Sequence, residues 1–308
     1  MHTKFWAWFL LIFTLLTILA GGIVRTTHSG MGCPDWPKCF GQWVPPTTAQ
    51  QLPPDFEKYL RKQDIDHTFN AFHTWVEYIN RLLATLLGVL AIVQLYIMWR
   101  NKSRNKNSSQ TVLNFARAFL AVVIITGLLG ALVVRFNLQH YSISVHMTLA
   151  FLLVAIQVAL CTHVCNACKK LNVNRQYKNL ILAFLILAFI QTALGTGVRM
   201  FIDDISLALQ YTQREKWLAI LPTIFIIHRT TSWLVVAGLL ALNYFSYKQH
   251  VFKKATLFLS GLILTEVLLG IIMAYANIPA WAQPIHVTLS ACIIAQILFM
   301  VFSSYVKK

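Results

Sequence analysis

Acidic residues are scarce in this sequence, which has only 10 Asp and Glu against 26 Lys and Arg among its 308 residues. Charged residues of both signs make up just 12% of the chain, whereas 57% of the residues are hydrophobic. This composition excludes a soluble globular domain. The net charge of +16 would suggest a nucleic-acid ligand in a soluble protein. Here the charges follow a membrane topology instead, and no nucleic-acid partner is expected.

Apolar runs long enough to cross a bilayer recur along the whole chain. Eight spans are predicted, at about 5–24, 76–99, 116–135, 142–164, 178–198, 218–244, 255–277 and 284–305. They leave almost no residues for a soluble domain. The sequence therefore predicts an all-α membrane protein with eight transmembrane helices.

Lysine and arginine gather on one side of this arrangement, and Asp and Glu are missing there. The basic groups are Lys4, segments 100–117 and 169–178, Lys248, Lys253, Lys254, Lys307 and Lys308. Because positively charged loops stay in the cytoplasm, both termini are expected inside. The same loops could contact anionic membrane lipid. Nine of the ten acidic residues fall in outer loops or at outer helix ends, and Glu266 is the exception.

Several short phrases occur twice in the chain, in the same order. VHMTLA at 145–150 returns as IHVTLS at 285–290, GGIVR at 21–25 as GTGVR at 195–199, YINR at 78–81 as IIHR at 226–229, and GLLG at 127–130 loosely as VLLG at 267–270. The spacing from Gly130 to His146 equals that from Gly270 to His286. We therefore predict a duplicated unit, with two pseudo-symmetric four-helix halves at 1–170 and 171–308.

Each half offers two candidate ligand positions on different helices: Asn80 and His146 in the first, His228 and His286 in the second. A histidine inside a membrane helix is costly unless it is paired or binds a metal. Two inward-facing imidazoles could take both axial positions of a haem iron. Zinc is a weaker interpretation because it needs a third or fourth ligand nearby, and a capping or packing role is the structural alternative.

Four arginines lie near the level of these ligands, namely Arg25, Arg81, Arg199 and Arg229. A guanidinium group can pair with the carboxylates of haem propionates. The alternative for each is snorkelling toward the membrane interface.

Acidic side chains provide two further candidates. His73, Glu77 and Asn80 share one face of the predicted second helix, at i, i+4 and i+7. Glu77 lies near the outer membrane edge, where a half-buried carboxylate can move protons; a surface ion pair with Arg81 is the alternative. Glu266, near the middle of the seventh span, is either functional or a protonated carboxyl bonded to a neighbouring helix.

Cysteines occur in two contrasting settings. Cys33 and Cys39 lie in the long first outer loop, roughly 26–75, whose Gly and Pro content predicts turns rather than a helix. On that oxidising side a disulfide can persist, and two unpaired thiols are the alternative. Cys161, Cys165 and Cys168 contain a single Cys-x-x-Cys at the cytoplasmic edge, which we interpret as structural or incidental thiols.

These motifs together resemble the heme A synthase family over nearly the whole chain. The specific part is the first-loop signature GMGCPDWPKCFG at 30–41. Glu77 in an acid-x-x-ligand-Arg motif adds to it, as do His146, His228 and His286. The resemblance implies a multi-pass enzyme of the bacterial plasma (inner) membrane that oxidises the C8 methyl group of heme O to the formyl group of heme A. Its implied partners are heme O, heme O synthase (a farnesyltransferase) and cytochrome oxidase assembly factors.

The resemblance also implies that the two halves bind different haems. His228 and His286 would be the iron ligands of a resident haem b. The first half would hold the substrate heme O, with Glu77 as the catalytic residue and a disulfide matching Cys33 and Cys39.

The chain departs from the family pattern at Asn80, where a histidine is usual. An amide is a poor iron ligand. The substrate iron would therefore be held either by His146 alone or higher toward the loop by His73. A diheme quinol-oxidising electron carrier is the alternative function, and a haem carrier without chemistry is a third. Asn80 and a cysteine-bearing loop in one half only argue against two equivalent electron-transfer haems.

Overall fold

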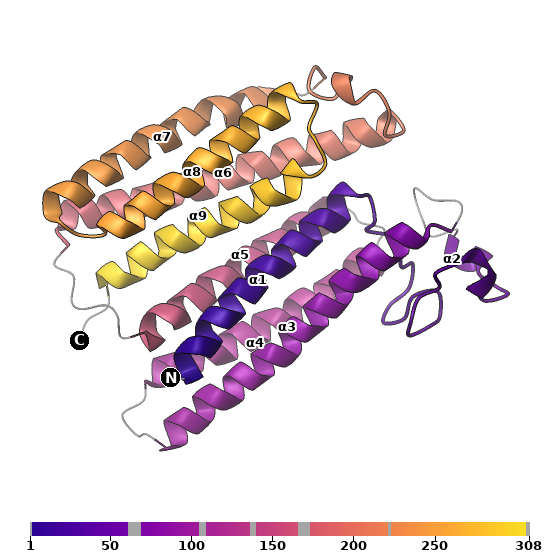
Figure 1. The fold of residues 1–308 in the computed structure, drawn as a ribbon, viewed down its shortest axis with the longest axis horizontal. Helices are drawn as coiled ribbons and strands as arrows, with labels where there is room; N and C mark the ends of the chain where they lie inside the picture. Colours follow the sequence, from indigo (N-terminus) through magenta and orange to yellow (C-terminus); the bar gives the residue numbers. More distant parts are fainter. Residues whose placement is uncertain are drawn as a thin grey trace. The chain divides into compact units, whose positions relative to one another are not determined.

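A computed structural model describes residues 2–60, 69–104, 109–135, 140–165, 173–220 and 223–305, and these residues form helices and loops without a sheet. Eight of the helices are long and apolar enough to cross a membrane. They are α1 (His2–Thr26), α3 (Ala71–Arg104), α4 (Gln110–Arg135), α5 (His140–Val164), α6 (Arg175–Ala208), α7 (Thr223–Gln249), α8 (Lys253–Tyr275) and α9 (Ala282–Tyr305) (Figure 1). The prediction of an all-α membrane protein with eight spans is confirmed.

Several helix ends differ from the sequence prediction, and those of α6 and α7 bear on the outer loop between them. The α6 helix continues to Ala208, although we expected its span to end at residue 198, so Asp203 lies in the helix and not in a loop. Arg199 Nη2 lies 2.8 Å from Asp203 Oδ1, and this i,i+4 ion pair supports the extra turns. The α7 helix begins at Thr223 and not near residue 218.

Residues 1–160 form one compact unit and residues 161–308 form another. In the first unit α3 packs against both α1 and α4. Gln94 of α3 and Gln157 of α5, both fully buried, exchange amide hydrogen bonds of 3.1 and 2.9 Å. Gln157 Nε2 also donates to the carbonyl oxygen of Ala7 in α1, at 2.8 Å. Such polar contacts join helices that lipid would otherwise solvate equally well.

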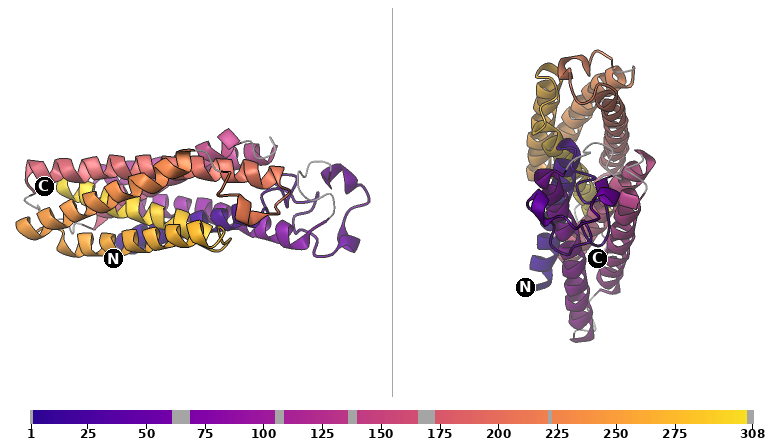
Figure 2. Two further views of the ribbon diagram at one scale, coloured as in Figure 1. Left: turned by 90° about the horizontal axis from the view of Figure 1, so that it is seen from above. Right: turned by 90° about the vertical axis from the view of Figure 1, so that its right-hand side faces the viewer.

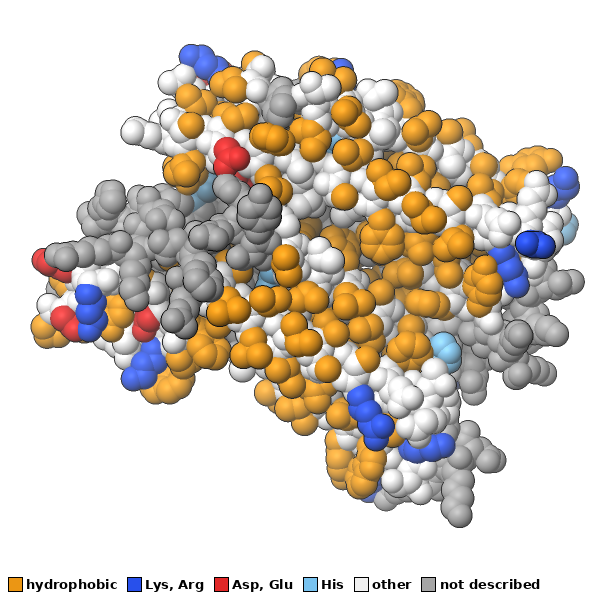
Figure 3. All heavy atoms as spheres, turned by 180° about the vertical axis from the view of Figure 1, so that it is seen from behind, with side chains coloured by type: hydrophobic (Ala, Val, Ile, Leu, Met, Phe, Trp, Pro, Cys, Tyr) orange, Lys and Arg blue, Asp and Glu red, His pale blue; other side chains and the backbone are white. Residues whose placement is uncertain are grey.

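In the second unit the four long helices close a ring. The α6 and α8 helices each pack against both α7 and α9, so α7 and α9 occupy opposite corners. Asn243 of α7 donates to the Ser260 hydroxyl of α8 at 3.0 Å, which is again a polar tie between apolar helices. Large hydrophobic side chains cover the lateral helix faces, as Figure 3 shows for one side of the molecule, and this surface suits contact with lipid.

The loop between α1 and α3 has a small core of its own. It contains a 3-10 turn, η1 (Ala49–Gln51), and the short helix α2 (Glu57–Leu60), and it extends beyond the N-terminal end of α3 (Figure 2). Cys33 and Cys39 form a disulfide. Both cysteines and Phe40 are fully buried, packed against Tyr59 and other apolar side chains of the loop.

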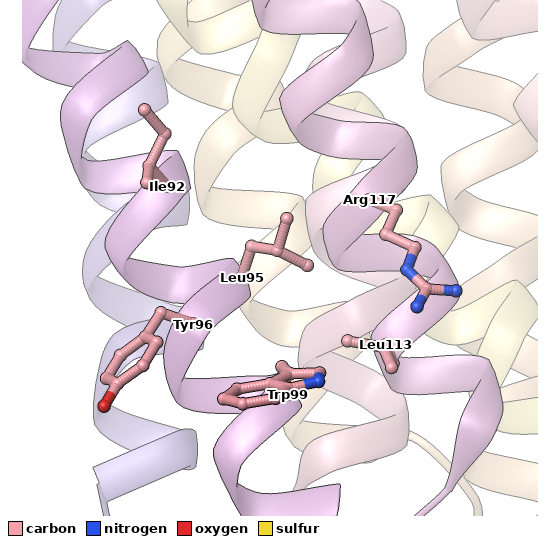
Figure 4. Close-up of a pocket in the computed structure, with 6 residues that line it drawn as sticks. All are labelled: Ile92, Leu95, Tyr96, Trp99, Leu113 and Arg117. Atoms are coloured by element: carbon pink, nitrogen blue, oxygen red, sulfur yellow. The ribbon is translucent and has the colours of Figure 1, made fainter.

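A shallow groove of about 300 Å³ lies between α3 and α4 (Figure 4). It is lined by Ile92, Leu95, Tyr96, Trp99, Leu113 and Arg117. The lining residues from α3 lie at the end of that helix remote from Glu77, because the helix rises about 1.5 Å per residue. The groove is therefore separate from the candidate site described next.

Candidate functional site

Glu77 lies in the second turn of α3 and is only 4% exposed. Its Oε2 accepts a hydrogen bond of 2.6 Å from the backbone N–H of Cys33. Its Oε1 accepts from Nε of Arg81 at 3.0 Å and from Nη2 of the same side chain. The ion pair that we considered for Glu77 is therefore present, but it is buried beneath the loop and not at a surface. Removing one partner of a buried pair costs about 3–5 kcal/mol.

Arg81 is the centre of this contact between the loop and α3. Besides its two bonds to Glu77, Nη1 donates to the carbonyl oxygens of Asp35 (2.5 Å) and Lys38 (3.2 Å), and Nη2 donates to that of Cys33 (2.6 Å). A guanidinium has five N–H donors, and all of them are used here. A haem propionate at Arg81 would have to displace one of these acceptors.

The loop signature also fixes its own shape. Asp35 accepts from the backbone N–H groups of Phe40 (2.6 Å) and Gly41 (3.0 Å), across the disulfide-closed turn. Gly32 passes so close to α3 that a Cβ would lie 2.2 Å from the carbonyl oxygen of His73, so only glycine fits. Sequence reasoning missed these roles of Asp35 and Gly32, although both lie inside the signature.

His146 of α5 faces a glycine on the neighbouring helix. A Cβ on Gly130 of α4 would lie 3.5 Å from Cε1 of His146. The Nδ1 of His146 is buried and has no hydrogen-bond partner among the described residues. The imidazole is therefore not held at Nδ1 by a hydrogen bond to any described residue, so its ring is free of a competing contact there.

The other candidate ligand position of this unit differs from its repeat partner. Asn80 of α3 is partly exposed and stands at the position matched to His228. Gly21 of α1, matched to Gly195, has no atom within 4 Å of the place where a Cβ would lie. His73, two turns before Asn80, lies in the first turn of α3 with its ring 5.8 Å from that of Phe72.

The second unit carries its two candidate histidines on different helices. His228 lies on α7 and His286 on α9, the helices at opposite corners of the ring. A Cβ on Gly195 of α6 would lie 3.1 Å from Cε1 of His228, and one on Gly270 of α8 would lie 3.8 Å from Cε1 of His286. Both Nδ1 atoms are buried and form no hydrogen bond within the described chain. Two opposed imidazoles flanked by two glycines fit a bis-histidine haem site in a helix bundle.

Polar groups surround these histidines. Gln191 of α6 donates to the backbone carbonyl of His228 at 2.9 Å and accepts from the Thr231 hydroxyl at 2.5 Å; sequence reasoning missed it because a glutamine on an apolar helix carries no motif. Glu266 of α8, which the sequence singled out, has its Oε2 3.3 Å from Nδ1 of His286.

The remaining arginines have varied surroundings. Arg199 Nη1 donates to Gln283 Oε1 at 2.6 Å, and Nη2 pairs with Asp203. Arg229 is exposed and lies 5.8 Å from the ring centre of Phe225. Arg25 is partly buried at the end of α1.

Cys161 and Cys165 form no metal centre in the part of the chain that the structure describes. Cys161 is buried, Cys165 is partly buried, and neither is in a disulfide. Cys168 lies outside the described residues. Among the described residues, no group of three His, Cys, Asp or Glu side chains could hold a metal ion.

Comparisons with known proteins identify the family. Residues 4–298 match the COX15-CtaA family model, described as cytochrome oxidase assembly protein. Heme A synthase from Beijerinckia indica is 25% identical over 92% of this chain and 87% of its own length, and the one from Novosphingobium aromaticivorans is 25% identical over 93% and 91%. Heme A synthase from Shewanella oneidensis is 27% identical over 49% of this chain, which spans only 42% of that relative. The chain therefore belongs to the COX15-CtaA family of cytochrome oxidase assembly proteins.

Proposed function

We propose that this protein is a heme A synthase, which oxidises the C8 methyl group of heme O to the formyl group of heme A. Membership of the family and the names of the relatives support this activity. The observation that carries the proposal is a chemical difference between matched positions. Glu77 and Arg81 form a buried ion pair beneath the disulfide loop, whereas in the second half the exposed Arg229 lies over the ring of the partly buried Phe225. Two equivalent electron-transfer halves would not need this difference.

We assign a resident haem b to the half at 171–308, with His228 and His286 as the residues that would hold its iron. When bound, haem b supplies one-electron transfer. The two imidazoles would hold the iron, and Gly195 and Gly270 let the two rings lie close against α6 and α8. Arg199 and Arg229 are the candidates for its propionates.

We assign the substrate heme O to the half at 1–170, with His146 and His73 as candidate iron ligands and Arg25 as a propionate candidate. Oxidation of a methyl group removes protons as well as electrons from the carbon. The Glu77 carboxylate would take such a proton or hold developing charge, since its two oxygens keep lone pairs beyond those given to Cys33 and Arg81. Arg81 keeps this carboxylate in place and joins it to the loop, which would exclude water from the reacting edge.

The membrane orientation is part of the proposal. The basic segments predict both termini in the cytoplasm of a bacterium, with the protein in the plasma membrane. The loop with the Cys33–Cys39 disulfide would then lie on the oxidising side, where such a bond persists. Heme O synthase would supply the substrate, and cytochrome oxidase assembly would consume the product.

Pigment extraction tests the activity. The chain is expressed in a bacterium that makes heme O but no heme A, and membrane haems are separated by chromatography. We expect heme A only in cells that carry the chain. Membranes that gain haem b but contain only heme O would instead favour the diheme electron carrier.

A further inference from the structure

Glu266 is a buried carboxylate that the proposed reaction does not use. It lies within the apolar helix α8, and its side chain is 16% exposed. Its Oε2 is inaccessible to solvent and accepts no hydrogen bond from the described residues. Acidic groups inside membrane helices are expensive unless they are paired, so this position needs a specific partner.

The nearest partner is the imidazole of His286 on α9. Glu266 Oε2 lies 3.3 Å from its Nδ1, within ion-pair distance, although the two atoms do not form a hydrogen bond. Gly270, one helical turn after Glu266 on the same face of α8, lies beside the same ring. A small rotation of either side chain would complete a bond from Nδ1–H to the carboxylate. Nδ1 would then carry the proton, and Nε2 would be left as the iron ligand.

Among its described residues, the first half lacks this arrangement. Matching Gly130 with Gly270 pairs Glu266 with Thr126, whose hydroxyl donates to the carbonyl oxygen of Val122 in its own helix at 2.7 Å. The Nδ1 of His146 therefore has no matching carboxylate. The carboxylate belongs only to the histidine assigned to the resident haem.

We propose that Glu266 is a positioning residue for His286, accepting a hydrogen bond from Nδ1–H and thereby fixing the orientation of this axial ligand and increasing its basicity. Metal-bound histidines commonly have such a carboxylate partner. A more basic ligand stabilises ferric over ferrous iron, so Glu266 would lower the reduction potential of haem b. This inference rests on the haem b assignment under the proposed function.

The test is a potentiometric titration of haem b in the full-length protein, comparing the wild type with Glu266→Gln. The amide keeps the size and can still accept a weaker bond, so low-spin haem b should be retained. We expect its potential to rise by about 59 mV, which corresponds to about a tenfold change in a one-electron equilibrium. Thr126→Val is the matched control and should leave the potential unchanged. A helix-packing role alone would move neither potential.

If haem b is present in both proteins and the potential of Glu266→Gln differs from that of the wild type by less than about a twofold change in the equilibrium constant, this inference is overturned. The proposed function would still stand. If Glu266→Gln instead loses haem b, Glu266→Asp decides. Retention of haem b by the aspartate variant supports the carboxylate role, and loss in both variants contradicts it. A wild-type protein without haem b would overturn both this inference and the haem assignment.

Discussion

Replacing Glu77 with glutamine separates its proposed role in proton transfer from its role in attaching the loop to α3. The substitution keeps the size of the side chain and removes the charge. The glutamine carbonyl can accept from Cys33 or from Arg81, but its amide group would face a donor. Hydrogen bonds to charged groups contribute about 1.5–3 kcal/mol each, so attachment of the loop should weaken by about 3 kcal/mol. Loss of a proton-transfer group typically lowers a rate by about 10²- to 10⁴-fold. We therefore expect formation of heme A to fall by at least about 100-fold while haem b is retained.

The assay is heme A formed per haem b, and loop attachment is followed by alkylation of Cys33 and Cys39 after mild reduction. Asp35→Asn is the matched control, because it weakens charge-assisted bonds inside the same loop and leaves Glu77 intact. Turnover of Glu77→Gln within about threefold of wild type, less than about 0.7 kcal/mol, would refute a catalytic role. If Asp35→Asn and Glu77→Gln lower heme A formation equally, and Cys33 and Cys39 are alkylated to the same extent in both variants, then Glu77 acts only by holding the loop in place.

Three further predictions concern the haem ligands and the loop. His228→Ala should abolish the low-spin haem b spectrum while the protein still inserts, and an unchanged spectrum would remove the assignment. Mass spectrometry of non-reduced membranes should find Cys33 and Cys39 in one cross-linked peptide; two freely alkylated thiols would contradict the disulfide, and reduction should slow turnover more than it disturbs haem b. We expect His73→Ala to abolish heme O binding and Asn80→Ala to be tolerated. Retained binding in His73→Ala, together with an inhibited six-coordinate low-spin haem in Asn80→His, would show that the iron lies near Asn80 instead.

The number and type of the membrane-spanning elements could be predicted from the sequence. Long apolar runs suffice to predict eight helices, because every span must cross the same hydrocarbon thickness and satisfy its backbone hydrogen bonds within the helix. Helix ends are less predictable, as α6 shows, because the Arg199–Asp203 pair extends it past the apolar run. The predicted pseudo-symmetry stays a prediction. Within each unit, however, the expected histidines do face glycines, at Gly130 in the first and Gly270 in the second.

The sequence predicts which residues form the candidate site, but not which of them contact one another. It indicates Glu77 and an ion pair with Arg81, but it cannot show that Arg81 donates its other hydrogen bonds to loop carbonyl oxygens that are distant in sequence. Likewise it marks Glu266 as unusual without revealing His286 as its neighbour, since that contact joins two helices whose rotation is set by packing. Pairings between elements depend on tertiary geometry, whereas burial preference and spacing are local.

Conversion of heme O by the purified protein tests the central claim most directly. The chain is purified with its haem b, supplied with heme O and a redox partner in lipid, and its haems are extracted and separated over time. We predict that heme A appears as heme O declines while the amount of haem b stays constant, and that His146→Ala keeps haem b but forms no heme A. Constant heme O in wild-type protein that retains low-spin haem b would contradict the assignment of an oxidising half and a resident-haem half.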